Sequence, residues 1–229
     1  MTNSKNIKDY FPPPESKGGW RYLINDDEVR SIVGMDPEKL SLLQHVQELI
    51  FGGDSWSIVI IRNGYLVREF YTFNMQIPSR FDIWSGAKSF TGTAWGILLE
   101  DSRQDKIPGN KKVTLDSHAY DFIPDGYPLT DPRKEQITIR HLLTMTSGIS
   151  GEKKGIICSP TSTNHGPFEY ALGKCPNRFG KMIDKLAAEP GTVWDYSDPA
   201  IMHLALSFVN ITGKEMSEFM KNRVFQPIG

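Results

Sequence analysis

The stretch FDIWSGAKSFTGTAWGILLE, residues 81–100, decides how the rest of this chain is interpreted. An apolar approach ends at Ser85, Lys88 follows three residues later, and an amphipathic run continues to Leu99. If that run is a helix starting near Ser85, the side chains of Ser85 and Lys88 lie on one face, one turn apart. A serine hydroxyl becomes an effective nucleophile when a neighbouring group takes its proton. The spacing therefore predicts a nucleophile beside its activating amine.

Lys88 needs a lowered pKa if it is to take that proton, because the pKa of an unperturbed lysine is about 10.4. Burial among apolar neighbours is expected to lower it, and the candidates are Phe81, Ile83, Trp84, Phe90 and Trp95. The alternative is a solvated helix start with Ser85 as cap and Lys88 exposed. That alternative is weakened because a cation in a first turn opposes the helix macrodipole.

Ser-x-x-Lys occurs a second time, at Ser150 and Lys153. This copy lies in a polar, glycine-containing segment with no helical period behind it. A short motif needs its structural context, so the copy at Ser85 is the candidate site.

Composition places the chain among ordinary soluble globular proteins, with 229 residues, 39% hydrophobic and 23% charged. A net charge of −1 gives no reason to expect a nucleic-acid or anionic-membrane partner. No apolar run approaches the ~20 residues of a membrane span. The N-terminus has no apolar signal region, so a cytoplasmic location is expected, or a periplasmic one if a leader was removed.

Cofactor and metal signals are absent from the sequence. The five histidines are scattered without ligand spacing: His45, His118, His141, His165 and His203. There is no nucleotide-binding fingerprint, and no Gly-x-Ser-x-Gly elbow of an α/β-hydrolase. Cys158 and Cys175 do not form Cys-x-x-Cys, and free thiols are expected in a cytoplasmic chain. No cofactor and no metal are therefore expected.

The chain is expected to have three parts: an extended arm (1–35), the N-terminal part of an α/β domain (36–104) and a mainly helical domain (105–229). The second part begins with a helix at Pro37. It continues with two β-like runs joined by Asn63-Gly64, the strongest short hairpin signal. The first run, Trp56–Ile61, is almost unbroken apolar sequence and predicts a strand buried on both faces.

The third part is expected to be rich in loops and mainly helical, with helices near Asp116–Phe122, Thr138–Thr146, Phe179–Ala188, Asp198–Asn210 and Lys214–Val224. Two clear strands are too few for a stable sheet. The sheet is therefore incomplete in this chain, and a missing C-terminal segment or a second chain is expected to complete it.

A second half of the site is predicted at WDYSD, residues 194–198, between a turn and a helix start. A Tyr196 phenol held near an ammonium can shuttle protons. The alternative is a tyrosine anchoring a turn, with Asp198 as N-cap. Asp198 can cap and line a site at once. Trp194 and the loop 149–167 are candidate walls of a cleft.

SGAKSFTG, residues 85–92, resembles the Ser-x-x-Lys-[Ser/Thr]-Phe-Thr-Gly signature of the serine β-lactamase and penicillin-binding-protein superfamily. The resemblance is greatest to the class C branch, which also holds DD-peptidases, family VIII esterases and 6-aminohexanoate-oligomer hydrolases. Residues 138–148, 189–198 and 224–229 resemble three further blocks of that branch in the same order.

The resemblance implies an α+β fold, with an antiparallel sheet flanked by helices and a mainly helical domain. It implies that Ser85 is the acylated nucleophile, that its backbone N–H serves an oxyanion hole, and that Lys88 activates it. Tyr196 would pass the proton to the leaving group and help to activate water. The resemblance leaves open whether Lys88 or Tyr196 is the base for acylation.

Two departures from the family pattern affect these expectations. Asp198 stands where asparagine is common, and a carboxylate beside Lys88 would raise the pKa of Lys88 and make it a poorer base. Asp198 therefore either points away as a cap or alters substrate preference. The third motif, Lys-Thr-Gly or His-x-Gly, is missing and belongs beyond residue 229.

The sequence thus predicts a serine hydrolase that acts through an acyl-enzyme on a small ester, lactone or amide. A β-lactamase or DD-peptidase is the alternative within the superfamily, ranked lower because no export signal is visible. A non-catalytic binding or scaffold member is the alternative outside enzymes.

Overall fold

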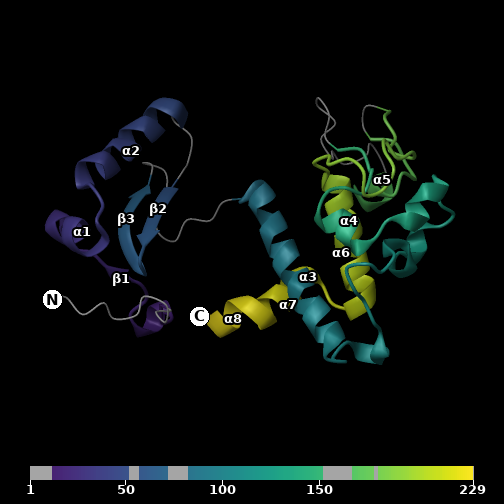
Figure 1. Cartoon of the computed structure of the whole chain (residues 1–229), viewed down its shortest axis with the longest axis horizontal. Coiled ribbons are helices and arrows are strands. Elements are labelled where there is room, and N and C mark those ends of the chain that lie inside the picture. The colour runs from purple at the N-terminus through teal and green to yellow at the C-terminus, as the bar shows by residue number, and fades with distance from the viewer. Residues whose placement is uncertain (1–11, 52–56, 72–81, 152–166, 178–179, 229) are drawn as a thin grey trace. The chain divides into compact units, whose positions relative to one another are not determined.

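The computed structural model describes residues 12–51, 57–71, 82–151, 167–177 and 180–228. The chain divides into two compact units, Met1–Asp82 with Phe225–Gly229 and Ile83–Val224. The first unit carries the sheet, and the second is built from helices, 3₁₀ turns and loops (Figure 1). Across the described ranges, no helix has both the length and the apolar character needed to cross a membrane.

The sheet of the first unit has three strands in the order β1-β3-β2. β2 (Ser57–Arg62) and β3 (Tyr65–Tyr71) are antiparallel, and β1 (Arg21–Tyr22) pairs parallel with β3. Asn63 and Gly64 both have positive φ, 53° and 74°. These angles suit the tight turn that Asn-Gly favours, so the predicted hairpin is confirmed.

The prediction that the first strand is buried on both faces is wrong. β2 pairs only with β3 in the described sheet. Val59 and Ile61, two positions apart and so on the same face of the strand, are 49% and 46% exposed. Apolar content alone cannot show whether a face of a strand is buried, because exposure depends on what packs against that face of the sheet.

The prediction of an extended arm over residues 1–35 is wrong for residues 26–33, which form α1 (Asp26–Val33). The Asn25 side chain accepts a hydrogen bond from the backbone N–H of Glu28 at 2.9 Å and caps the helix. Gly34, with φ of 62°, ends it. The helix buries Val29 and Val33 in the core of the first unit, with Leu23, Leu40 and Val67.

α2 (Pro37–Phe51) begins with proline at its first position, as predicted. Only part of its predicted apolar stripe is covered. Leu40 is buried, whereas Leu43, Val46 and Leu49 are exposed.

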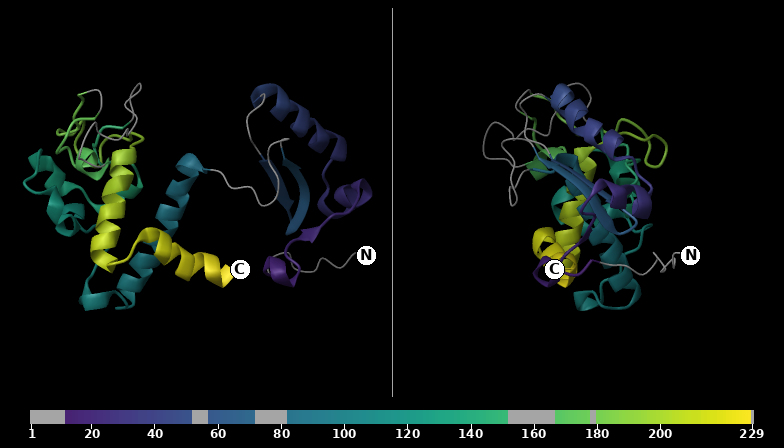
Figure 2. Two further views of the ribbon diagram at one scale, coloured as in Figure 1. Left: turned by 180° about the vertical axis from the view of Figure 1, so that it is seen from behind. Right: turned by 90° about the vertical axis from the view of Figure 1, so that its left-hand side faces the viewer.

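α3 (Ala87–Arg103) belongs to the second unit, where it packs against α6 (Asp198–Thr212) and α7 (Met216–Met220) (Figures 1 and 2). The sequence grouped this helix with residues 36–104, but its buried side faces the helical half of the chain. Trp95 explains why. Its indole N–H donates to the carbonyl of Leu204 at 3.2 Å, and its ring meets Phe208 edge-on at 6.1 Å.

Thr138 caps α4 (Ile139–Leu143), as predicted, and His141 completes a capping box with it. The helix predicted over Asp116–Phe122 is shorter in the structure, where only Ala119–Phe122 forms a 3₁₀ turn. The predicted Lys214–Val224 helix becomes α7 followed by a π turn, Lys221–Phe225, and α8 (Gln226–Ile228). The remaining short elements are η2 (Glu15–Lys17), η4 (Pro108–Asn110), η6 (Pro124–Gly126), η7 (Pro132–Gln136) and α5 (Pro167–Ala171).

The helix predicted over residues 179–188 is wrong for the described residues 180–188, which have no helical structure. Their backbone donors go to distant partners. The N–H of Leu186 donates to the Asp131 carboxylate at 2.9 Å, and that of Ala187 donates to the carbonyl of Gly148 at 2.8 Å. These long-range hydrogen bonds take the place of the hydrogen bonds to the carbonyl four residues earlier that an α-helix needs.

The cap of α6 also differs from the prediction. Ser197, not Asp198, is the N-cap, since its hydroxyl accepts from the backbone N–H of Ala200 at 3.2 Å. The carboxylate of Asp198, the first residue of α6, is therefore not the group that caps this helix.

His203 lies on α6 and is fully buried. Its Nδ1 is 2.7 Å from the carbonyl of Pro199, and its Nε2 is 2.9 Å from the hydroxyl of Tyr120. A neutral ring that donates from Nδ1 and accepts at Nε2 satisfies both contacts. Burial lowers the pKa of His203 to about 4, outweighing its bond to Pro199.

The free energy of unfolding is expected to fall by about 3 kcal/mol between pH 6.5 and pH 4 because of His203. In that window the unfolded chain binds a proton that the folded state excludes, so stability is lost as the pH falls. Chemical denaturation at several pH values measures this slope. His203→Asn removes the titrating ring, and an unchanged slope in that variant would contradict the assignment.

Candidate active site

Ser85 lies at the start of α3, in a 3₁₀ turn, Trp84–Gly86, that leads into the helix. Trp84 has a φ of 47°, which is unfavourable for a bulky side chain. The turn is closed by a hydrogen bond from the N–H of Gly86 to the carbonyl of Ile83 at 2.9 Å. Ser85 is exposed, and Lys88 follows it one helical turn later.

Three side chains from two distant segments meet at the Ser85 hydroxyl. The Lys88 ammonium donates to Ser85 Oγ at 3.1 Å. The Tyr196 hydroxyl donates to the same oxygen at 2.5 Å, across 111 positions of sequence. The Lys88 nitrogen also lies 4.8 Å from the centre of the Tyr196 ring. The structure thus brings together Ser85, Lys88 and Tyr196, as the sequence predicted.

Asp198 forms an ion pair with Lys88. The two side chains are only 31% and 19% exposed. Asp198 therefore faces Lys88 and does not point away as a cap, which settles the geometric alternative left open by the sequence.

The pKa of Lys88 is raised, not lowered. Partial burial lowers it, but hydrogen bonds with Asp198 and Tyr196 and the attraction of the Asp198 carboxylate outweigh that effect. Three of the expected apolar neighbours, Ile83, Trp84 and Phe90, are exposed. Trp95 is buried in the core of the second unit, and Phe81 lies outside the described residues. The prediction of a lowered pKa is therefore wrong, and the ammonium form of Lys88 is favoured.

The remaining candidate residues are Trp194, the second Ser-x-x-Lys and the two cysteines. Trp194 is 65% exposed, two positions before Tyr196. In the second Ser-x-x-Lys, the carbonyl of Ser150 accepts from the Ser197 hydroxyl at 3.4 Å, and Lys153 lies outside the described residues. Cys175 is a buried free thiol, and Cys158 lies outside the described residues.

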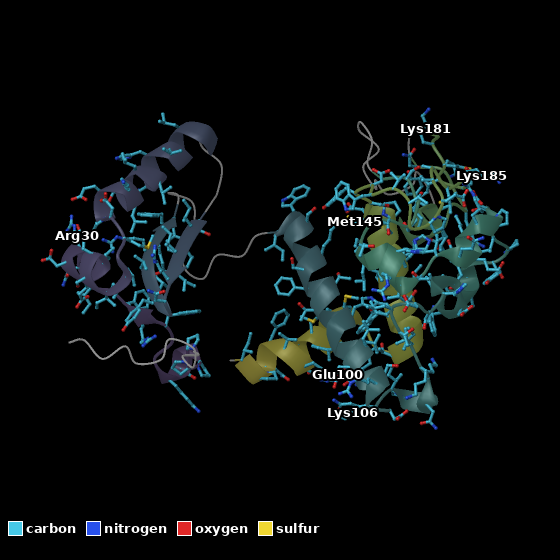
Figure 3. All side chains as sticks on the ribbon, viewed as in Figure 1. Arg30, Glu100, Lys106, Met145, Lys181 and Lys185 are labelled. Atoms are coloured by element: carbon cyan, nitrogen blue, oxygen red, sulfur yellow. The ribbon has the colours of Figure 1, made fainter. Side chains whose placement is uncertain are left out.

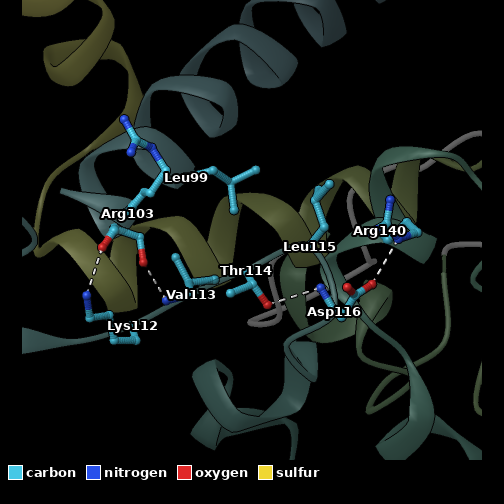
Figure 4. Close-up of a pocket in the computed structure, with 9 residues that line it drawn as sticks. Leu99, Arg103, Lys112, Val113, Thr114, Leu115, Asp116 and Arg140 are labelled. Atoms are coloured by element: carbon cyan, nitrogen blue, oxygen red, sulfur yellow. Dashed lines mark hydrogen bonds and ion pairs between the residues drawn. The ribbon is translucent and has the colours of Figure 1, made fainter. Parts of the chain in front are cut away.

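A cavity of about 480 Å³ lies at the opposite end of α3 from Ser85 (Figure 4). Its lining includes Leu99, Val113 and Leu115, with an ion pair at 2.9 Å between Arg140 and Asp116. None of the predicted site residues lines it. This cavity is therefore separate from the candidate site at the start of α3.

The backbone hydrogen bonds that hold the Tyr196 segment in place were not predicted from the sequence. The N–H of Asp195 donates to the carbonyl of Met145 at 2.9 Å, and that of Gly191 donates to the carbonyl of Thr146 at 2.7 Å. The segment after α4 therefore runs beside the tyrosine segment. The two family-like blocks, residues 138–148 and 189–198, were visible signals, but nothing in either block says that they touch.

Comparison with known proteins finds a family model described as Beta-lactamase that matches residues 54–229. PbpX of Bacillus subtilis, described as a candidate penicillin-binding protein, is 26% identical over 196 residues, which cover 81% of this chain and 41% of that protein. The lovastatin esterase of Penicillium rubens is 30% identical over 110 residues, which cover 47% of this chain and 26% of that protein.

Among solved structures, the D-amino acid amidase of Ochrobactrum anthropi matches with a TM-score of 0.60 at 21% identity. The match covers 82% of this chain and 53% of that chain. The α+β fold predicted from the sequence is therefore confirmed. The chain spans less than half the length of PbpX and about half the length of the amidase.

Proposed function

This chain belongs to the Beta-lactamase family, and on that premise we propose that it carries the nucleophile of a serine hydrolase. The substrate is a small ester, lactone or amide, and the reaction proceeds through an acyl-enzyme on Ser85. The observation that carries the proposal is that the Lys88 ammonium and the Tyr196 phenol both contact the Ser85 hydroxyl, at 3.1 Å and 2.5 Å from its Oγ. Nucleophilic catalysis needs such a set.

The proposed reaction has two halves. In the first, Ser85 Oγ forms a bond to the substrate carbonyl carbon, and the bond from that carbon to the leaving group breaks. Tyr196, in contact with Ser85 Oγ, gives its own proton to the leaving group as it takes the serine proton. In the second half, water attacks the acyl carbon, the bond from that carbon to Ser85 Oγ breaks and the acid product leaves. Tyr196 takes a proton from the attacking water and returns one to Ser85 Oγ. The backbone N–H of Ser85 supplies one oxyanion donor, typically worth about 10²–10³ in rate.

Lys88 acts as an ammonium in this proposal. Asp198 raises the pKa of Lys88, so the amine keeps its proton to higher pH. A protonated Lys88 stabilises negative charge on Ser85 Oγ or on the Tyr196 oxygen, both of which it approaches. Tyr196 is then the proton carrier of the pair.

Asp198→Asn is expected to move the alkaline limb of the pH profile of kcat/KM to lower pH. Removing the carboxylate lowers the pKa of Lys88, so the required ammonium is lost earlier as the pH rises. Steady-state rates must extend from pH 5 to about pH 12 to measure the limb, because the pKa of an unperturbed lysine is already about 10.4 and the pKa of Lys88 is raised above its ordinary value. Movement of the acidic limb to lower pH would instead identify neutral Lys88 as the base.

The direct test is covalent labelling with a fluorophosphonate. Mass spectrometry of the labelled protein is expected to find the adduct on Ser85. Ser150 is the internal control because it begins the other Ser-x-x-Lys of the chain. An adduct elsewhere, with Ser85 unlabelled, rejects the proposal.

Two relatives support esters and amides as the substrate class, through the activities in their names: the lovastatin esterase and the D-amino acid amidase. The exposed indole of Trp194, close in sequence to Tyr196, suits an apolar substituent on the substrate. A hydrolysis panel of p-nitrophenyl esters, short amides, nitrocefin and D-Ala-D-Ala peptides ranks the classes. A clear preference for nitrocefin or for the D-Ala-D-Ala peptides would favour a β-lactamase or a DD-peptidase.

A non-catalytic binding or scaffold member is the second candidate. The observation that favours it is the ion pair between Asp198 and Lys88, which opposes a neutral amine. Turnover by the unaltered protein that exceeds neither the uncatalysed background nor that of Ser85→Ala would support this second candidate.

The sheet of the first unit is proposed to receive further strands from another segment or chain. The exposed Val59 and Ile61 on the edge strand β2 support this.

A further inference from the structure

The segment that carries Tyr196 is held from both sides by residues that follow α4. Asp195, just before the tyrosine, donates its N–H to the carbonyl of Met145 at 2.9 Å. Its carboxylate accepts a hydrogen bond from the N–H of Gly151 at 3.0 Å. Ser197, just after the tyrosine, donates its hydroxyl to the carbonyl of Ser150 at 3.4 Å. Tyr196 thus lies between two anchored neighbours.

The packing at Gly151 is too close for any side chain. A Cβ placed there would lie 1.8 Å from the carbonyl oxygen of Tyr196 and 2.9 Å from a carboxylate oxygen of Asp195. Glycine is the residue that permits such a backbone approach. The segment after α4 therefore touches the backbone of the tyrosine itself.

Met145, labelled in Figure 3, adopts a φ of 57°, which a non-glycine residue rarely adopts. Its carbonyl is the one that Asp195 bonds. The segment 145–151 thus contacts the tyrosine segment at Met145, which has an unusual backbone conformation, and at Gly151, where no side chain fits. A strained backbone at one contact and a close backbone approach at the other indicate that the contact is specific.

We propose that Asp195 is a positioning residue that sets the Tyr196 phenol against Ser85. The hydrogen bond from its backbone N–H to Met145 fixes the position of the tyrosine segment. The hydrogen bond that its carboxylate accepts from Gly151 fixes the orientation of that segment about its own axis. The inference rests on the proposed function, in which the phenol moves the Ser85 proton. The contacts described for Asp195 are with Met145 and Gly151, so in this proposal its effect passes through Tyr196.

Asp195→Ala is expected to lower kcat about 10–100-fold and to change KM less than threefold. A displacement of about 1 Å at a reacting group can cost about 10²-fold in rate. Asp195→Asn keeps an oxygen that accepts from Gly151 and is expected to restore kcat to within about threefold. Asp116→Ala is the matched control, because it removes a hydrogen-bonded carboxylate at the opposite end of α3.

A double-mutant cycle shows whether Asp195 acts through Tyr196. Asp195→Ala is expected to lower kcat less than twofold further when it is added to Tyr196→Phe. Denaturation curves of every variant show the folded fraction, to which the rates are normalised. The same fold-loss in both backgrounds overturns the proposal, because Asp195 then acts independently of the phenol.

A readout without turnover separates this inference from the proposed function. In protein labelled with [¹³Cζ]tyrosine, the signal missing from Tyr196→Phe belongs to Tyr196. Asp195→Ala is expected to shift or broaden this signal, and Asp195→Asn to leave it in place. If the signal responds but the protein turns over no substrate, the positioning role stands and the hydrolase proposal fails. If the protein is active and the signal does not move, the positioning role fails.

Discussion

Replacing Ser85 with alanine is expected to lower kcat/KM for the best ester or amide substrate by about 10⁴-fold or more. The oxygen removed is the one that Lys88 and Tyr196 both contact, at 3.1 Å and 2.5 Å. Loss of a serine nucleophile leaves only the residual acceleration from binding and from the oxyanion donors. Steady-state kinetics with a chromogenic substrate measure the loss, and fluorophosphonate labelling should disappear with it.

Stability provides the control for this variant. Ser85 is exposed, so the substitution is expected to change the free energy of unfolding by less than about 0.5 kcal/mol. Ser150→Ala removes the hydroxyl of the other Ser-x-x-Lys and should leave kcat/KM within about twofold of the unaltered protein. Retained turnover in Ser85→Ala would show that Ser85 is not the nucleophile.

Replacing Trp95 with alanine is expected to reduce the free energy of unfolding by about 3–5 kcal/mol. Trp95 is completely buried and joins α3 to α6 through its bond to the Leu204 carbonyl and its edge-on contact with Phe208. The substitution leaves a cavity and a backbone carbonyl without this donor. Urea denaturation measures the loss.

Trp84→Ala is the matched control, because the same type of side chain is removed from the turn that precedes α3 in the second unit. Trp84 is 86% exposed, so little buried surface is lost and a change below about 1 kcal/mol is expected. Similar losses at Trp84 and Trp95 would contradict the assignment of Trp95 to the core that supports the site.

The nucleophile segment was predictable because its signals are local. Ser85 and Lys88 are three positions apart, and a helix alone brings their side chains together. Asn63-Gly64 and Thr138 are equally local, since a turn and a cap each need only a few neighbouring residues. Tyr196 was placed at the site by its family-like block, and the structure brings it to Ser85.

The features that were missed depend on distant partners. The exposure of Val59 depends on what packs against its face of the sheet, and residues 180–188 bond to Asp131 and Gly148 instead of forming a helix. The raised pKa of Lys88 depends on Asp198, 110 positions away, being released from capping by Ser197. No local pattern contains that information, although the departure from asparagine at Asp198 pointed to the effect.

The exposed indole rings at Trp84 and Trp194 give the candidate site an optical signal of its own once Trp20 and Trp56, the other two tryptophans of the chain besides Trp95, are replaced by phenylalanine. Indole fluorescence responds to solvent, so a dissolved iodide quencher reaches the rings of Trp84 and Trp194 in that variant and leaves the buried Trp95 bright. A group attached to Ser85, next to Trp84, shields that ring. Formation of the acyl-enzyme and its decay can therefore be followed as a change in quenching, without a coloured substrate.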